Sequence, residues 1–219
     1  MKTTSIIAIA IALLSSIQLA TGATTTAFFY KAGLAGSYVA QNTPGTILDQ
    51  NNWIFSTPGG INFSDHGIWL GVLKMGNPGT QWMIQIMAPQ DGEINTGLFL
   101  ANRWGMQDAS ISGFSWFGDG RGVNTSTTWF EISDFSYDIN TNAVTSLAVD
   151  AIQFEETWNK KDVNFNTDPC AYISYRFNSS VGINEAPSAA LLAQTVPEPS
   201  SFALAGLGVG LVFIRRKRM

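Results

Sequence analysis

The stretch Gln81–Ala88, QWMIQIMA, indicates the fold class because it shows the two-residue period of a β-strand. Trp82, Ile84 and Ile86 would point to one face of such a strand. The two glutamines and two methionines of the stretch would point to the other face. This imperfect alternation is typical of a strand with one face in the core and the other face partly covered. The stretch therefore predicts a half-buried β-strand.

Short segments of the same kind recur from about residue 24 to about residue 181, with almost no helical periodicity. Clusters of Gly, Asn, Asp and Pro separate these segments, and such residues favour turns. The other predicted strands are Ser37–Gln41, Trp53–Ser56, Gly67–Lys74, Leu98–Ala101, Ser110–Phe117, Trp129–Tyr137, Ala143–Phe154 and Ala171–Asn178. About nine short strands at fairly regular spacing predict an all-β domain, an antiparallel two-sheet sandwich of jelly-roll type. A barrel is the alternative, because the sequence does not determine whether a sheet closes.

The N-terminus has the three parts of a secretory signal peptide over residues 1–23. Lys2 supplies the positive charge, Ile6–Leu14 is a continuous apolar run, and small residues follow it. The run is too short to span a bilayer as a helix, which takes about 20 residues. We therefore expect a signal helix that is cleaved near Gly22 or Ala23, with a retained anchor as the alternative.

The C-terminus combines a Pro-Glu-Pro motif at 197–199, an apolar segment at Phe202–Ile214 and a basic cluster at 215–218. As a helix, the apolar segment would be about 20 Å long at 1.5 Å per residue. The hydrocarbon core of a bilayer is about 30 Å thick. Glycines weaken the helix further, and the basic cluster favours a cytoplasmic C-terminus. These features predict a short, transient transmembrane helix, with an ordinary C-terminal anchor as the alternative.

The same C-terminal residues resemble the PEP-CTERM sorting signal of Gram-negative bacteria in their order, spacing and terminal position. The matching residues are Pro197, Glu198, Pro199, Arg215, Arg216, Lys217 and Arg218. The resemblance implies that an exosortase, an integral membrane enzyme, recognises the chain at the inner membrane and removes the tail near the Pro-Glu-Pro. It also implies export to the cell surface or extracellular matrix of a bacterium that makes exopolysaccharide.

The expected organisation is a β-sandwich domain at 24–181, a flexible linker at 182–196 and the sorting signal at 197–219. Without the predicted signal peptide and tail, the remaining body has 7 basic and 15 acidic side chains, a net charge of about −8. This charge argues against nucleic acid as a partner. Cys170 is the only cysteine, so the body has no internal disulfide. We expect Cys170 to be a small buried side chain, with a nucleophile as the alternative.

Part of the body, about Gly92–Ser180, also resembles a domain that recurs in exported PEP-CTERM proteins. The matching stretches are NTGLFLANRW at Asn95–Trp104, GDGRGVN at Gly118–Asn124, WFEISDFSYD at Trp129–Asp138, VTSLAVDAIQFEE at Val144–Glu156 and ISYRFNSS at Ile173–Ser180. That pattern has two cysteines where this chain has Val123 and, approximately, Glu155. The resemblance therefore implies no shared cross-link, and it brings no biochemical activity.

The titratable residues form no obvious catalytic group. His66, the only histidine, follows Ser64 and Asp65, but neighbouring strand residues point to opposite faces and cannot form a triad. Glu155 and Glu156 would diverge in the same way. We therefore expect no enzyme activity. A hydrolase with a distant serine or with other carboxylates is the alternative.

No cofactor is predicted, because one histidine and one cysteine cannot supply a typical zinc site. Asp138–Asn142 begins like a calcium loop, but Ala143 replaces the glycine, so a hairpin turn is favoured. Calcium bound elsewhere in loops is the alternative. The Gly-rich loop Gly118–Gly122 lacks the βαβ context of a phosphate site. We expect Arg121 in this loop, and Arg176 in the last strand, to stabilise turns by binding carboxylates or carbonyls.

Aromatic side chains are the remaining candidates for binding. Tryptophans can stack on sugar rings, although a tryptophan in a β domain is more often buried. Trp104, beside Arg103, and Trp158, in the polar stretch EETWNKKD, are predicted to be an exposed glycan-binding pair. The sequence thus predicts an exported, exosortase-processed protein with a non-enzymatic structural or adhesive role linked to exopolysaccharide. A carbohydrate-binding module is the first alternative and a secreted hydrolase the second.

Overall fold

The computed structural model describes residues 23–56, 62–64, 67–106, 108–157 and 162–195. The strands in these residues are β1 (Thr25–Ala32), β2 (Thr46–Asp49), β3 (Trp53–Phe55), β4 (Asn62–Ser64), β5 (Gly67–Lys74), β6 (Asn77–Met87), β7 (Gly97–Arg103), β8 (Ser112–Gly118), β9 (Ser126–Asp138), β10 (Ala143–Glu155) and β11 (Cys170–Ser179), and the helix is α2 (Ala189–Thr195). The predicted signal helix and the predicted C-terminal tail lie outside the described residues. Within the described part of the chain, no helix is long and apolar enough to cross a membrane.

The stretch QWMIQIMA forms a half-buried strand, as predicted. It lies in β6, where the side chains of Trp82, Ile84 and Ile86 are at most 2% exposed. β6 pairs antiparallel with β5 and β8, and Ile84 lies opposite Leu70 on one side and Trp116 on the other. Three neighbouring strands therefore direct their apolar residues to the same face.

All eleven described strands belong to one hydrogen-bonded sheet with the order β2-β1-β11-β10-β4-β5-β6-β8-β7-β9, and β3 pairs with β5. β9 also pairs with β10 over most of its length, so the order returns on itself. β7 is parallel to β8 and antiparallel to β9, which links the two parts of the sheet. The described residues of β4 and β10 pair only at Asn62 and Ala143. The result is a mixed sheet that is nearly closed into a barrel.

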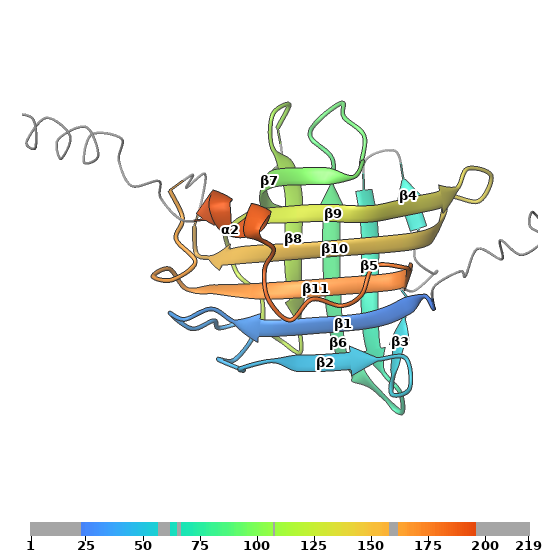
Figure 1. Cartoon of the computed structure of the whole chain (residues 1–219), viewed down its shortest axis with the longest axis horizontal. Helices are drawn as coiled ribbons and strands as arrows, with labels where there is room; N and C mark the ends of the chain where they lie inside the picture. Colours follow the sequence, from blue (N-terminus) through green and yellow to red (C-terminus); the bar gives the residue numbers. More distant parts are fainter. Residues whose placement is uncertain (1–22, 57–61, 65–66, 107, 158–161, 196–219) are drawn as a thin grey trace, which may run out of the picture.

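The predicted jelly-roll sandwich is therefore correct only in its all-β class. One strand pair is parallel, and the layers are joined by strand pairing instead of lying as two separate sheets. Figure 1 shows β1, β2, β7, β9, β10 and β11 as a front layer that crosses a back layer of β3, β4, β5, β6 and β8. Crossed layers joined at corners are one of the two ways in which β-sheets pack. Side-chain alternation reports which face of a strand is buried but not which strand lies beside it.

A large apolar core fills the space between the two layers. Trp82 and Trp116 of the back layer stack with ring centroids 5.0 Å apart. Tyr30 of the front layer lies 4.9 Å from Trp82 and 5.5 Å from Trp116. Such aromatic contacts bury a large apolar area, and they join the two layers without a disulfide.

The outer face of the front layer is covered as well. Residues 181–195, here called the C-terminal strap, run over this face and end in α2 (Figure 1). Leu191 of the strap is fully buried in a second apolar cluster with Phe154 and Tyr172 of the sheet. This arrangement differs from the flexible linker predicted for 182–196. A segment of small and polar residues gives no periodic signal, but this one finds partners on a sheet face that only the folded chain assembles.

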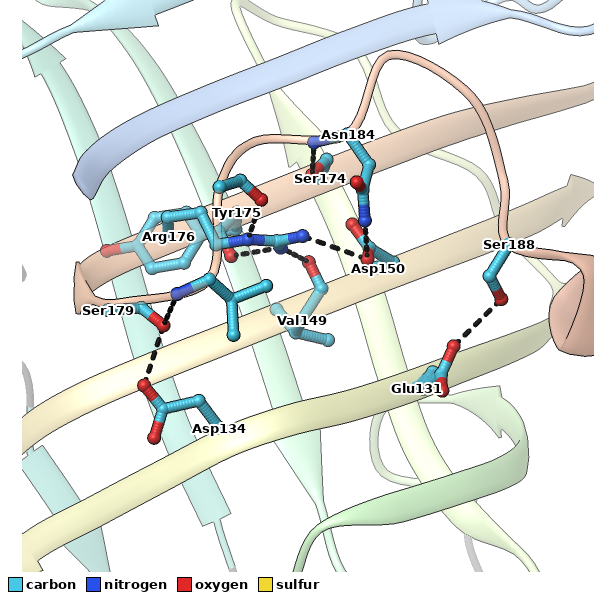
Figure 2. A network of polar contacts seen from close by, with 12 residues as sticks. Glu131, Asp134, Val149, Asp150, Ser174, Tyr175, Arg176, Ser179, Asn184 and Ser188 are labelled. Carbon is cyan, nitrogen blue, oxygen red and sulfur yellow. Dashed lines mark hydrogen bonds and ion pairs between the residues drawn. The ribbon is translucent and has the colours of Figure 1, made fainter. Parts of the chain in front are cut away.

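Polar groups on the same face bind the strap (Figure 2). The fully buried guanidinium of Arg176 donates to the carbonyl oxygen of Gly182 at 2.8 Å and pairs with Asp150 at 3.0 Å. The amide of Asn184 donates to the same carboxylate at 2.8 Å. The prediction that Arg176 stabilises a turn by binding carboxylates and carbonyls is therefore confirmed.

The predicted strand Ser37–Gln41 is wrong. The backbone N–H groups of Tyr38 and Val39 donate to the carboxylate of Glu155 at 2.7 and 3.2 Å, and Gln41 has a φ of 50°. The segment is therefore a turn held by a buried side chain at the end of β10. Its partner lies more than a hundred residues away in the chain, so no local pattern could reveal it.

The sequence prediction also missed β1, β2 and β4. β1 contains the consecutive buried residues Ala27, Phe28 and Phe29. Phe28 packs in the core between the layers, whereas Phe29 packs in the outer cluster with the strap. A strand that is buried on both faces loses the polar and apolar alternation on which the prediction depended.

Buried acidic groups predict a loss of stability at alkaline pH. Burial raises the pKa of the Cys170 thiol from 9.0 to about 12, and burial also raises the pKa of Tyr172 and Tyr175 above 10.0. The unfolded chain loses these protons at lower pH than the folded chain. The contribution of the three buried groups to the free energy of unfolding is therefore complete below about pH 9 and decreases as the pH rises further. We expect the urea midpoint to be lower at pH 10.5 than at pH 8, and a Tyr175→Phe variant to show a smaller decrease. An equal midpoint at both pH values would contradict this.

Candidate functional site

One row of side chains crosses the back layer on the face that points away from the core. Trp69 on β5, Gln85 on β6 and Ser115 on β8 lie opposite one another in register. In each strand, the residues on both sides of this position have their side chains in the core. The pleat therefore directs the three side chains of the row outward. The side chain of Trp69 is 43% exposed.

Trp104 lies beside this row. It directly follows β7, and its backbone N–H donates to the Oγ of Ser115 at 2.9 Å and to the carbonyl oxygen of Phe114 at 3.2 Å. The indole of Trp104 meets that of Trp69 edge to face, with centroids 5.2 Å apart and an interplanar angle of 79°. Trp104 is 36% exposed. Two large aromatic rings that remain partly exposed side by side form an apolar surface feature, whereas single exposed apolar residues are common.

A cleft of about 540 Å³ extends from Trp104 over the outer face of β6 and β8. Gln81, Met83 and Phe117 contribute to its lining, and the loop 118–123 lies at it as well. The volume is within the range of small-ligand sites, about 300–1,000 Å³. The cleft therefore combines aromatic, apolar and amide-bearing side chains on a rigid sheet.

The loop at the cleft begins with a tight turn. Asp119 and Gly120 have φ angles of 51° and 74°, and Gly118 and Arg121 exchange two backbone hydrogen bonds of 2.8 Å. An Asp-Gly pair with positive φ at both residues is typical of a two-residue hairpin turn. A Cβ atom on Gly118 would lie 2.3 Å from the carbonyl oxygen of Gln81, so only glycine permits this close approach of the strands.

Arg121 joins this turn to its surroundings. Its Nε donates to the carbonyl oxygen of Val39 at 3.1 Å, and its Nη1 pairs with Asp119 at 3.1 Å. The guanidinium also lies 5.2 Å from the ring centroid of Trp82. The prediction that Arg121 stabilises a turn is confirmed, and one wall of the cleft is thereby held in place.

The strand beneath the cleft is supported from inside the fold. The fully buried amide of Gln153 accepts from the backbone N–H of Trp116 at 2.8 Å and donates to its carbonyl oxygen at 3.1 Å. β8 pairs with β7 over residues 112–114, and among the described residues no strand pairs with Trp116 on that side. Gln153 therefore replaces a neighbouring strand for Trp116, across the two layers.

Several predicted site residues lie outside the described residues. They are Trp158, His66 and all seven sorting-motif residues from Pro197 to Arg218. The calcium-like stretch is described, and there the carboxylate of Asp138 accepts from the backbone N–H groups of Asn140 and Thr141 at 2.8 and 3.3 Å. These bonds form the hairpin turn between β9 and β10, which confirms the favoured interpretation.

The two glutamates considered for hydrolysis and the nearby Asp150 have separate partners. Asp150 pairs with Arg176 on the outer face, Glu155 binds the turn at Tyr38, and Glu156 accepts from the backbone N–H of Asn124 at 3.1 Å. Cys170 is fully buried, as predicted. Among the residues that the structure describes, no three His, Cys, Asp or Glu side chains are grouped to hold a metal ion.

Sequence reasoning missed Trp69 as the neighbour of Trp104. A local signal was available, because Trp69 stands between Ile68 and Leu70 in a predicted strand and therefore had to face away from them. Nothing local indicated that the end of β7 would bring Trp104 against it, since this contact depends on the β7–β8 pairing.

Comparison with known proteins identifies the end of the chain. The protein family described as the PEP-CTERM protein-sorting motif matches residues 195–218. No curated protein and no solved structure matches the chain significantly. The predicted sorting signal is therefore confirmed, and the chain carries a PEP-CTERM motif as exosortase substrates do.

Proposed function

We propose that this chain, whose PEP-CTERM motif indicates exosortase processing and export, is a surface or matrix protein that binds polysaccharide without enzymatic turnover. It would reach the inner membrane transiently, lose its tail and remain at the cell surface or in the extracellular matrix. The observation that carries the proposal is the exposed pair Trp69 and Trp104, of which Trp104 lines the cleft and Trp69 packs against it. A structural or adhesive role follows from a surface that can hold a polymer.

The geometry of the tryptophan pair suits a sugar ring. One indole face can stack on the apolar C–H face of a pyranose, while the second ring, at 79° to the first, can border the edge of the sugar. The amides of Gln81 and Gln85 line the adjoining cleft and can exchange hydrogen bonds with hydroxyl groups. The two rings are not coplanar, so they do not form a flat platform for a crystalline polysaccharide surface. They favour the binding of one sugar unit of a bent chain at this point.

The charges at the cleft support binding over hydrolysis. Asp119 is the one carboxylate among the lining residues that the structure describes, and it is paired with Arg121 at 3.1 Å. Most glycosidases use two carboxylates, about 5–10 Å apart, on either side of the scissile bond. A single paired carboxylate at one end of the cleft supports retention of a polymer.

Replacing Trp104 with alanine should weaken the binding of polysaccharide at least about tenfold, because aromatic anchors contribute most of the affinity at such sites. The test uses the exopolysaccharide of the producing bacterium in affinity electrophoresis with the purified protein. Retardation of the unaltered protein and its loss in the variant are expected. Trp69→Ala should act in the same direction.

Tyr137→Ala is the matched control, since Tyr137 is an exposed aromatic residue, 38% accessible, near the β9–β10 hairpin. This variant should bind polysaccharide like the unaltered protein. Equal retardation of the Trp104→Ala variant and the unaltered protein, or no retardation of either, would contradict the proposed function.

A further inference from the structure

The sorting motif begins inside the folded body. Thr195 is the last residue of α2 and the first residue matched by the motif. It is fully buried, its carbonyl oxygen accepts from the backbone N–H of Phe165 at 3.1 Å, and its Oγ1 donates to the carbonyl oxygen of Leu192 at 3.1 Å. The motif is thus attached to the body without a free spacer before it.

The strap is held at several points from Gly182 to Thr195, so this attachment is firm. Ser188 directly precedes α2, and its Oγ accepts from the backbone N–H of Leu191 at 3.1 Å, which is the bond of a helix N-cap. The same Oγ donates to Glu131 on β9 at 2.8 Å (Figure 2). The side chain of Leu191 is fully buried in the outer cluster. Release of α2 therefore breaks polar and apolar contacts together.

Covalent geometry limits how far the cleavage region can lie from the body. Pro197 is two residues beyond Thr195, and two extended residues reach at most about 7 Å. A membrane-embedded enzyme has to enclose the chain around the bond that it cuts, and a folded domain attached this closely obstructs such access. We propose that the docked strap restrains exosortase processing, so that the enzyme acts on chains in which the end of α2 has left the sheet.

This restraint has a quantitative consequence. When only a minor state is competent, the apparent rate is reduced by the fraction of chains in that state. Local opening of a terminal element is the least costly opening of a domain, so processing continues, but slowly. The mature protein then keeps the strap on its sheet. The inference rests on the sorting motif and not on the polysaccharide site, so Trp104→Ala should leave the processing rate unchanged.

The test compares tail removal in cells that contain the exosortase, by pulse labelling of the full chain and its loss of mass over time. The first variant has about eight Gly and Ser residues inserted between Thr195 and Val196, which gives a flexible spacer of roughly 16 Å. The second is Leu191→Ala, which removes the buried anchor of α2. We expect each change to raise the initial rate about tenfold or more.

Gln194→Ala is the control, because Gln194 is an exposed residue of the same helix. Its rate should equal that of the unaltered chain. The spacer variant keeps every contact of the strap. It therefore tests the restraint on processing even if Leu191→Ala fails to fold. An unchanged or lower rate in the spacer variant overturns the proposal, and so does the absence of tail removal in all chains.

Discussion

Replacing Arg176 with alanine should lower the free energy of unfolding by about 3–5 kcal/mol, because it leaves a buried carboxylate without its cation. The guanidinium is fully buried and lies 3.0 Å from Asp150. It also donates to the carbonyl oxygens of Val149, Tyr175 and Gly182. All of these acceptors lose the guanidinium donor at once (Figure 2). Urea denaturation followed by tryptophan fluorescence measures the loss.

Arg103→Ala is the matched control for this prediction. Arg103 is exposed and donates to the carbonyl oxygen of Asn124 at 2.8 Å. Its removal should change the free energy of unfolding by no more than about 0.5 kcal/mol. The Arg176→Ala variant should also lose the protection of the strap against proteolysis, since Gly182 lies within it. Similar free energies of unfolding for both variants would show that the buried pair does not hold the strap.

Gln153→Leu should lower the free energy of unfolding by about 2–4 kcal/mol, because it leaves the backbone N–H and C=O of Trp116 unpaired in the core. Leucine has a similar size but no polar atom, so the change removes mainly the hydrogen bonds. For a protein of this length, such a loss corresponds to a decrease in Tm of about 4–16 °C. Differential scanning calorimetry measures it.

The control is Gln81→Leu, the same exchange at an exposed position on β6. Its Tm should stay within about 2 °C of that of the unaltered protein. If both variants melt at the same temperature, the amide of Gln153 does not support β8. If Gln153→Leu alone melts early, the wall of the cleft depends on this cross-layer contact.

Side-chain alternation is clearest in two of the strands that the sequence predicted correctly. Gly67–Lys74 and most of Asn77–Met87 have one face in the core and one face away from it. The alternation of apolar and polar residues therefore predicted them. The opposite holds for Thr25–Ala32, which is buried on both faces because the strap covers the front layer. The prediction at Ser37–Gln41 was wrong because the polar partner of this segment, Glu155, is distant in the chain.

The candidate site was predictable only in its parts. The turn chemistry of Arg121 followed from a side chain with several fixed donors in a loop, and the polar neighbours of Trp104 predicted its exposure. The contact between Trp104 and Trp69 needed the parallel pairing of β7 with β8. Such pairings depend on loop lengths and on packing between distant segments, which single-strand patterns do not report.

The sequence by itself determined the all-β class, the outward or inward direction of single strands, and the PEP-CTERM motif, because each of these depends on residues that are close together in the chain. Only the tertiary structure decided that the sheet nearly closes, that two tryptophans meet at a cleft, and that the predicted linker is a docked strap ending at Thr195. These features depend on contacts between distant residues, and the free energy of such contacts appears only when the whole chain has folded.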